Sequence, residues 1–108
     1  MANNGKIANG VINTPNQEIV LASLDNTVAY GSVQIIIVNR SDTDVATVKI
    51  AIVQGSAVIT DSDYIEYNIE IAPHDRYTDN VQLLSGGETI KAVSDKGNLT
   101  FRIAGLVK

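Results

Sequence analysis

β-Branched residues are the feature that most restricts the fold of this chain. It contains 14 Ile, 12 Val and 8 Thr among 108 residues, but only 6 Leu. β-Branched side chains lose rotamer freedom in a helix and pack well on a pleated sheet. No stretch of helical length fits a three- or four-residue apolar repeat better than it fits strict alternation. We therefore expect an all-β protein.

Alternation and turn residues place the strands. We expect a short N-terminal hairpin turning at Asn9-Gly10, because Asn-Gly is the strongest two-residue turn signal. The regular spacing of the segments predicts an antiparallel two-sheet β-sandwich of about seven to nine strands. The spacing does not distinguish a jelly-roll connection of the strands from an immunoglobulin-like one. The further strands are predicted over residues 18–24, 33–39, 45–54, 64–71, 77–84, 88–94 and 99–106.

The strands differ in the number of faces that they bury. Segment 33–39, VQIIIVN, is apolar in both registers, so it is predicted to be a central strand covered on both sides. SGG at residues 85–87 is predicted to close a hairpin, and DKGN at residues 95–98 to join the last two strands as another. In segment 64–71, Ile65, Tyr67, Ile69 and Ile71 are predicted to point inward, and Glu66, Asn68 and Glu70 outward.

Length and composition indicate one globular domain. We expect residues 1–17 to form an N-terminal arm or short hairpin and residues 18–108 to form a single β-sandwich domain. The first ten residues have no apolar core, and the longest apolar run is IIIV, so we expect no signal peptide and no membrane partner. A net charge of -4, with Lys and Arg scattered, predicts no nucleic-acid partner. The chain has no cysteine, which excludes disulfides and thiolate metal sites.

The segment IAPHDRYTD, residues 71–79, holds the only histidine and gathers residue types that catalytic sites use. A general base needs an orienting group and a nucleophile within hydrogen-bond reach. His74 and Asp75 are sequence neighbours, so their side chains diverge on an extended chain. Pro73 cannot donate to a sheet ladder, and Asp75 can accept backbone N–H groups in a turn. We therefore expect a solvated corner between two strands and no catalytic residue.

Two acidic pairs raise the alternative of a calcium site. Asp42 with Asp44, and Asp61 with Asp63, alternate carboxylates as calcium loops do. Neither pair continues with the Gly and Glu of an EF-hand loop. We expect these side chains to cap backbone donors, and we expect no metal and no cofactor.

A sugar site is a further alternative, because such sites stack exposed aromatic rings on the ligand. Tyr67 and Phe101 fall on inward registers. Tyr30, Tyr64 and Tyr77 lie near strand ends, where a ring can be exposed.

Three stretches between residues 33 and 106 carry a resemblance to known proteins. The first, VQIIIVNRSDTDVATVKIAIVQ, is an apolar strand ending in Asn39-Arg40, a polar turn and an alternating strand. The second, DYIEYNIEIAPHDRYT, is an aromatic-rich strand followed by a proline corner with Asp75. The third is GGETIKAVSDKGNLTFRIAGL, in which NLTF opens the last strand. In order and spacing they resemble a group of small bacteriophage virion structural proteins, which are capsid decoration (cement) or tail- and fibre-associated all-β domains.

The resemblance implies a non-enzymatic virion protein, first of all a capsid decoration protein that binds and stabilises the shell. A tail- or fibre-associated protein and a carbohydrate-binding module for host attachment are the alternatives. The implied partners are the major capsid protein or other virion proteins, in a homo-oligomer or multicopy assembly. The implied location is the virion, after synthesis in the host cytoplasm.

Partner contacts are expected at the N-terminal arm and at the proline corner. Because both registers of segment 33–39 cannot face one core, its second face needs a partner, a second copy, or a strand or loop of the chain itself. His74 would be the one side chain of the corner to change charge near neutral pH. The expected contact residues are Asn3, Asn4, Lys6, His74, Arg76 and Tyr77.

Overall fold

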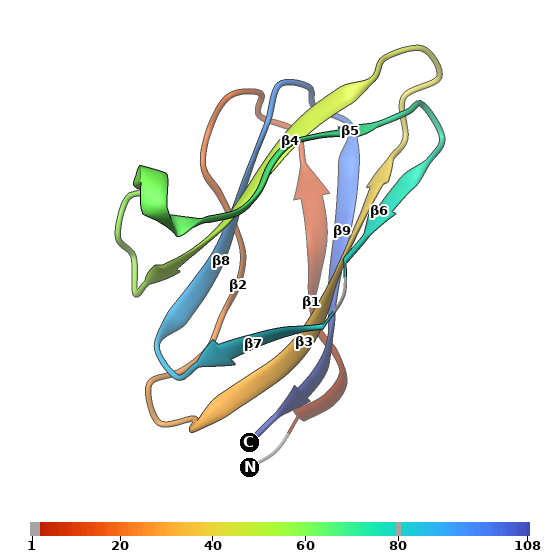
Figure 1. Cartoon of the computed structure of the whole chain (residues 1–108). Coiled ribbons are helices and arrows are strands. Elements are labelled where there is room, and N and C mark those ends of the chain that lie inside the picture. Colours follow the sequence, from red (N-terminus) through yellow and green to blue (C-terminus); the bar gives the residue numbers. More distant parts are fainter. Residues whose placement is uncertain (1–2, 80) are drawn as a thin grey trace.

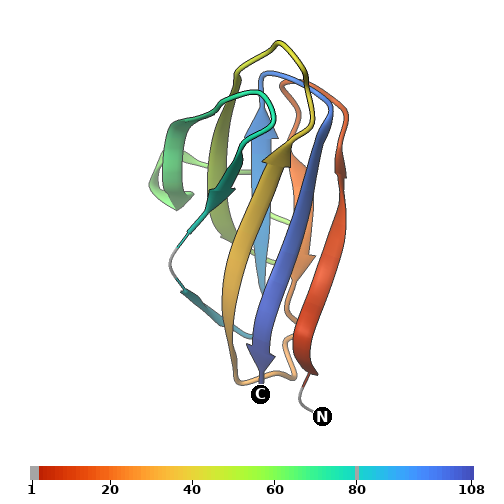
Figure 2. The same ribbon diagram turned by 90° about the vertical axis from the view of Figure 1, so that its right-hand side faces the viewer.

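A computed structural model of the chain describes residues 3–79 and 81–108, with side chains from residue 7 onward. These residues form nine strands in two antiparallel sheets that face each other, so the predicted two-sheet β-sandwich is confirmed (Figures 1 and 2). Sheet A has the order β1 (Asn3–Ile12), β9 (Leu99–Val107), β3 (Tyr30–Asn39) and β6 (Arg76–Thr78), and β7 (Gln82–Ser85) also pairs with β3. Sheet B has the order β2 (Ile19–Ser23), β8 (Glu88–Ser94), β4 (Ala46–Gln54) and β5 (Tyr64–Ile71).

The core lies between the sheets and is almost entirely apolar. Alternate residues of each central strand point into it, as the period of two in a strand requires. On sheet A the outward neighbours of these residues are more exposed. Core residues from the central strands are Val33, Ile35, Ile37, Val48, Ile50, Ile90, Leu99, Phe101 and Ile103, none more than 8% exposed.

Residues 3–12 form one strand, β1, so the predicted turn at Asn9-Gly10 is wrong. β1 runs antiparallel to β9, and Gly10 lies opposite Phe101. A Cβ atom on Gly10 would lie 3.0 Å from Cζ of that ring. The glycine therefore leaves room for an aromatic ring instead of forming a turn. The division of the chain at residue 17 stays a prediction.

Both hairpins predicted after residue 77 are wrong, because their turns cross between the sheets. SGG leads from β7 in sheet A to β8 in sheet B, and DKGN leads from β8 back to β9 in sheet A. A Cβ atom on Gly86 would lie 1.9 Å from the carbonyl oxygen of Val28. This crossing therefore requires a residue without a side chain.

β5 departs from its predicted alternation through a β-bulge. Its pairing with β4 shifts register between Val48 and Ile50, where Asn68 has a φ of 58°, and again between Ile50 and Ala51. Asn tolerates this left-handed conformation better than most residues. The inserted residue leaves Tyr67 on the surface with 61% exposed, so its predicted inward direction is wrong.

The same irregularity corrects the predicted outward direction of Glu66. Glu66 is partly buried, near enough to Tyr77 and Asp79 for its charge to raise the pKa of both side chains. Beyond the bulge, Ile71 is buried as predicted and Ile69 packs against the core. The bulge thus places an acidic side chain where the edges of the two sheets meet.

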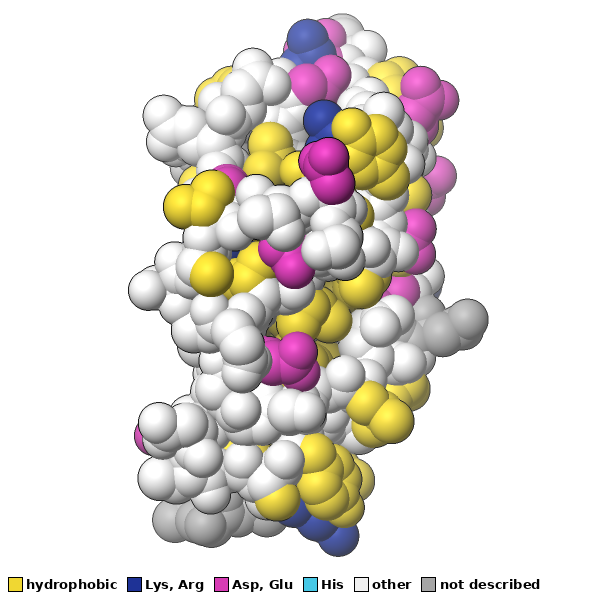
Figure 3. Space-filling view, turned by 60° about the vertical axis from the view of Figure 1, so that its left-hand side comes forward, with side chains coloured by type: hydrophobic (Ala, Val, Ile, Leu, Met, Phe, Trp, Pro, Cys, Tyr) yellow, Lys and Arg dark blue, Asp and Glu magenta, His cyan; other side chains and the backbone are white. Residues whose placement is uncertain are grey.

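A strap of residues 55–63, between β4 and β5, folds over the outer face of sheet B. Beneath it, Ala51 and Val53 point away from the core and yet are at most 3% exposed. Lys91, also on this face, donates through Nζ to the carbonyl oxygen of Ala57 at 2.8 Å and to the carboxylate of Glu18 at 3.0 Å. Figure 3, turned toward the side of β2 and β8, shows hydrophobic side chains interspersed with acidic ones.

β3 is covered by the chain on only one of its two faces. Its inward residues Val33, Ile35 and Ile37 are at most 1% exposed, whereas Ile36 and Val38 on the other face are partly exposed. Within residues 3–79 and 81–108, no strand or loop lies over the outer face of sheet A (Figure 2). The prediction that this strand is covered on both sides is therefore wrong for the chain taken alone.

Asn39 ends the inward row of β3 and ties the two sheets together. It is 1% exposed. Its Nδ2 donates to the carbonyl oxygen of Ile71, at the end of β5, at 2.9 Å, and to that of Asp44 at 2.8 Å. Its Oδ1 accepts the N–H of Ser41 at 3.0 Å. A buried side chain with its donors and acceptor paired fixes one arrangement of the strands around it.

We expect Asn39→Ala to lower the free energy of unfolding by about 1–3 kcal/mol, because it leaves the buried carbonyl group of Ile71 unpaired. Urea unfolding followed by circular dichroism measures this change. The control is Asn9→Ala, at an exposed residue of β1, for which we expect the free energy of unfolding to change by no more than about 0.5 kcal/mol. Equal effects of the two substitutions would contradict the role given to Asn39.

Candidate functional site

The corner that follows β5 folds as a turn held against β3. The N–H of Asp75 donates to the carbonyl oxygen of Ala72 at 3.1 Å, and the N–H of His74 donates to that of Asn39 at 3.0 Å. The Asp75 carboxylate accepts the N–H of Arg76 at 2.8 Å. The predicted corner between two strands is therefore confirmed, with Asp75 shaping the turn.

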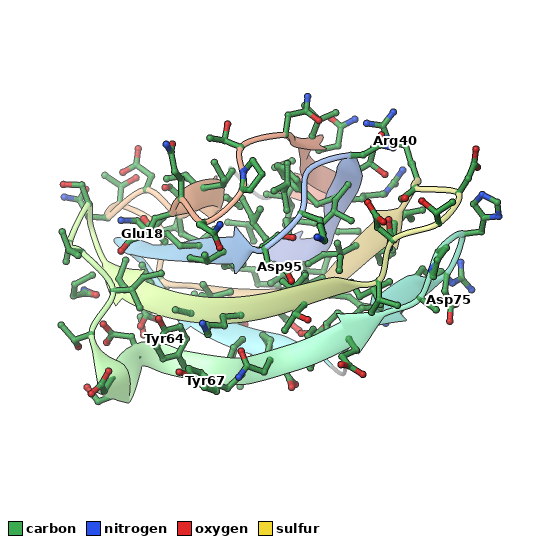
Figure 4. The ribbon with its side chains drawn as sticks, turned by 90° about the horizontal axis from the view of Figure 1, so that it is seen from above. Glu18, Arg40, Tyr64, Tyr67, Asp75 and Asp95 are labelled. Carbon is green, nitrogen blue, oxygen red and sulfur yellow. The ribbon has the colours of Figure 1, made fainter. Side chains whose placement is uncertain are left out.

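The side chain of His74 is directed to Asp42 in the loop between β3 and β4. Nε2 of the imidazole lies 2.5 Å from Oδ1 of Asp42, and the side chains are 65% and 87% exposed. Exposed ion pairs contribute little to stability, because water screens them. Arg40 and Asp75 lie at the same end of the sandwich (Figure 4). The corner presents charged groups to solvent without a buried site around the histidine.

The residues predicted as partner contacts do not form one cluster. Arg76 is exposed on the outer face of sheet A, whereas Tyr77 is half-buried and directed between the sheets. The backbones of Asn4 and Lys6 pair with Leu106 and Ala104 of β9. The side chains of Asn3, Asn4 and Lys6 lie outside the described residues. Contact by any of these residues with a partner stays a prediction.

The expectation that the acidic pairs cap backbone donors holds for Asp63, whereas the carboxylates of Asp42 and Asp44 bind the side chains of His74 and Thr43. Asp63 ends the short 3-10 helix η1 (Asp61–Asp63), and its Oδ2 accepts the N–H of Thr60 at 2.8 Å and the Thr60 hydroxyl group at 2.9 Å. In the part of the chain that the structure describes, no three His, Asp or Glu side chains gather as metal ligands. That part also contains no helix long and apolar enough to cross a membrane.

Two tyrosines and a lysine form an exposed aromatic cluster on sheet B. The rings of Tyr64 and Tyr67 pack edge to face, with their centroids 5.0 Å apart (Figure 4). Nζ of Lys49 lies 5.0 Å from the centroid of the Tyr67 ring. Rings and a cation arranged in this way can contact the partly apolar face of a sugar.

Asp79 forms a buried polar site where β6 gives way to β7, within the segment predicted as one strand. Its N–H donates to the carbonyl oxygen of Ile35 at 3.2 Å, and its Oδ1 accepts the N–H of Ile35 at 2.8 Å. The carboxylate thus replaces a backbone carbonyl in the ladder on β3. The prediction of one strand over residues 77–84 is therefore wrong, because two short strands, β6 and β7, stand in its place.

The other oxygen of Asp79, Oδ2, is buried and has no hydrogen-bond partner among the described residues. Burial raises the pKa of this carboxyl group, and the nearby charge of Glu66 adds to the increase. Burial also raises the pKa of the Tyr77 hydroxyl group, with a further contribution from the adjacent carboxylate of Glu66. Sequence reasoning missed this cluster, because Asp79 and Glu66 meet only through the bulge and the break between β6 and β7.

The second site is the outer face of sheet A, of which the sequence indicated only the second face of segment 33–39 and not the neighbouring strands. The strand register lines up its side chains in rows across four strands. The residues of these rows are uncharged or basic. One row consists of Asn9, Arg102, Ile36 and Thr78, and the next of Val11, Thr100, Val38 and Arg76.

A shallow groove of about 330 Å³ follows β9 on this face. Its apolar lining includes Val11, Ile36 and Val38, and Arg102 and Asn9 supply polar groups. Val11 is 50% exposed. Leu106 and Leu83 extend the apolar surface along sheet A, with 46% and 74% exposed. Contiguous exposed apolar groups of this kind mark surfaces that bind other molecules.

Comparisons of this chain with protein-family models, with curated proteins and with solved structures found no match. The resemblance to bacteriophage virion proteins therefore stays a prediction. The surfaces of the chain itself are therefore the basis for a proposed function.

We expect Asp79→Asn to stabilise the protein above about pH 4, the ordinary range of an aspartate. Folding raises the pKa of Asp79. The favourable contribution of Asp79 to the free energy of unfolding is therefore full below the pKa of the unfolded state, and it is lost as the pH rises through the pKa of the folded state. Asn keeps an acceptor for Ile35 and cannot ionise. At pH 7 we expect a gain of about 1 kcal/mol in urea unfolding, the scale of one unsatisfied buried group.

The control for this substitution is Asp61→Asn, on an exposed residue of η1. It should leave the pH dependence of stability as in the wild type. Parallel pH profiles for the wild type and Asp79→Asn would show that Asp79 is not held in an unfavourable ionised state.

Proposed function

We propose that this protein is a non-enzymatic structural component of a bacteriophage virion, with capsid decoration as its first role. The observation that carries the proposal is the contrast between the two outer faces of the sandwich. The strap covers Ala51 and Val53 of sheet B, whereas Ile36 and Val38 of sheet A are left at the surface of the described structure. A face that is partly apolar and uncovered in the free chain is suited to bury itself on another protein.

The edges of the sheets support docking through a face. A regular edge strand offers unpaired backbone groups to a neighbouring chain, and bulges prevent such pairing. β1 shifts register between Lys6 and Ala8, and β2 between Val20 and Ala22. β5 carries the bulge at Asn68, and Asp79 interrupts the edge made by β6 and β7. All four edges are thus irregular, which disfavours growth by strand addition.

The strand order also supports the proposal. Along the chain, β6 and β7 occupy one edge position of sheet A, which gives eight strand positions. Sheet A then contains positions one, eight, three and six, and sheet B contains positions two, seven, four and five. We infer from this order a jelly-roll connection, an architecture found in viral capsid and lectin domains. A fold alone does not determine function, so the strand order supports the proposal only together with the uncovered outer face of sheet A.

Repeated contacts on a capsid lattice explain how a shallow surface can be sufficient for stable binding. A decoration protein meets the same lattice many times, and linked contacts give an avidity far above that of one contact. Copies of an 11.5 kDa domain that are joined in an oligomer can then coat a shell through a modest contact face on each copy.

The test is to add the purified protein to expanded capsids that lack it. We expect saturable binding and a higher temperature of capsid disruption, because each bound copy bridges or braces shell subunits. Sedimentation measures binding, and calorimetry measures disruption. Capsids that neither bind the protein nor gain stability would refute the decoration role. Many copies per particle support decoration, whereas a few copies at one vertex assign the protein to a tail or fibre.

The aromatic cluster of Tyr64, Tyr67 and Lys49 favours a second candidate, a carbohydrate-binding module for host attachment. Binding on a glycan array that Tyr67→Ala abolishes would support this role. The absence of any bound glycan would remove it.

A further inference from the structure

We infer that the groove on the outer face of sheet A binds a segment of partner protein that carries carboxylate and aliphatic side chains together. The inference deepens the proposed docking role and rests on it. It commits to the chemistry of the partner segment, which the docking role alone leaves open.

The first evidence is the segregation of charge between the sheets. The five strands of sheet A contain no Asp or Glu, although the chain has 12 of these residues. The strands do contain Lys6, Arg76 and Arg102. All the carboxylate side chains thus lie in sheet B, in loops or at the corner. A protein of net charge -4 thus has no carboxylate in the strands of sheet A, and Asp79, which binds β3 between β6 and β7, is buried.

The second evidence is the position of the arginines among apolar groups. Arg102 lies in register between Asn9 and Ile36, and Arg76 lies beside Val38. Both arginines are exposed, and no ion pair to either is found among the described residues. A guanidinium group can bind a carboxylate with two parallel hydrogen bonds. An aliphatic side chain of the same partner can then cover Ile36 or Val38.

The size of the groove limits the ligand. At about 330 Å³ it is at the low end of small-molecule pockets, and it is open along its length. One or two side chains of an extended segment fit this shape, with the rest of the segment lying on the rim. In an extended chain, alternate residues point to the same side. The matching segment therefore has an acidic and an aliphatic residue two positions apart.

A protein segment explains the surface better than a nucleic acid does. Binding to phosphates depends on many cationic contacts, and single-stranded ligands stack on exposed rings. The groove offers Arg102 as its cation, and Phe101, the ring in its lining, is only 8% exposed. Its apolar lining would remain unused by a phosphate backbone.

The test uses the peptide Asp-Ser-Val-Ser-Asp-Ser-Val, blocked at both ends, which places Asp and Val on one side when extended. We expect its titration to shift backbone NMR signals of residues 9–11, 34–38 and 100–104, with binding that weakens as salt is raised. We expect Arg102→Gln to weaken binding about tenfold, the scale of one charge-assisted hydrogen bond. Ile36→Thr should weaken it about threefold or more, on the scale of lost methyl burial.

The matched control is Lys49→Gln, which removes one cation from the opposite sheet and should leave peptide binding unchanged. A second control peptide has Lys in place of Asp and should not bind. The inference is overturned by an absence of shifts at 1 mM peptide, on the order of the weakest specific affinities. It is also overturned by equal binding of the Lys peptide, or by tighter binding of an oligothymidine to the same residues.

The same variants separate this inference from the proposed function. If Arg102→Gln and Ile36→Thr bind capsids as the wild type does and the peptide fails, the groove is not the docking site and the decoration role stands. If the peptide binds as expected and capsids take up no protein, the decoration role fails and the groove remains a binding site.

Discussion

The two-faced apolar character of β3 is the constraint on which the rest of this structure depends. β3 pairs with β9 on one side and with β6 and β7 on the other, so it holds sheet A together. Its residues Val33, Ile35 and Ile37 enter the core, which leaves Ile36 and Val38 on the opposite face. A chain of this length builds two layers and has no third layer for sheet A. The uncovered face follows from the sequence of one strand.

Sheet B shows what the chain does when it covers such a face itself. Ala51 and Val53 also point away from the core, and the strap buries both. The strap is held from below by Lys91, which reaches Ala57 and Glu18. On sheet B, apolar residues of the outer face are thus covered by a segment of the chain itself. We interpret the other sheet as one that is completed by a partner.

Two buried polar residues in the sandwich have contrasting surroundings. Asn39 has its donors and its acceptor paired, so it fixes the corner and links the sheets. Asp79 is paired through one oxygen only, and Glu66 lies near enough to raise its pKa. A half-satisfied buried carboxylate costs stability. It nevertheless supplies the acceptor that Ile35 needs where β6 ends, which a regular strand would supply through a carbonyl group.

Alternation of apolar residues predicted the all-β class, the two-sheet sandwich and the positions of most strands, because burial of one face imposes a period of two. Pro73 and Asp75 predicted the corner, because their effects on the backbone are local. Gly10 and Gly86 misled the turn predictions. Gly10 makes room for Phe101, and Gly86 makes room for the carbonyl group of Val28. In the sequence, such a glycine cannot be distinguished from a glycine in a hairpin turn.

The bulge at Asn68 and the break at Asp79 were beyond prediction for a related reason. Each inserts one residue into a ladder, and the inserted residue reverses which side chains face the core. The cluster of Glu66, Tyr77 and Asp79 depends on both irregularities. The absence of Asp and Glu from the strands of sheet A is visible in the sequence, but it acquires meaning only when those strands are known to form one sheet.

The central claim is that the outer face of sheet A is buried in the assembled particle. Hydroxyl-radical footprinting, read by mass spectrometry, tests it most directly in the free protein and in particles that retain it. We expect Ile36, Val38 and Leu106 to be protected in the particle, whereas exposed Tyr67 on sheet B is oxidised equally in both states. Protection of Tyr67 with unchanged oxidation of Ile36, Val38 and Leu106 would contradict the claim.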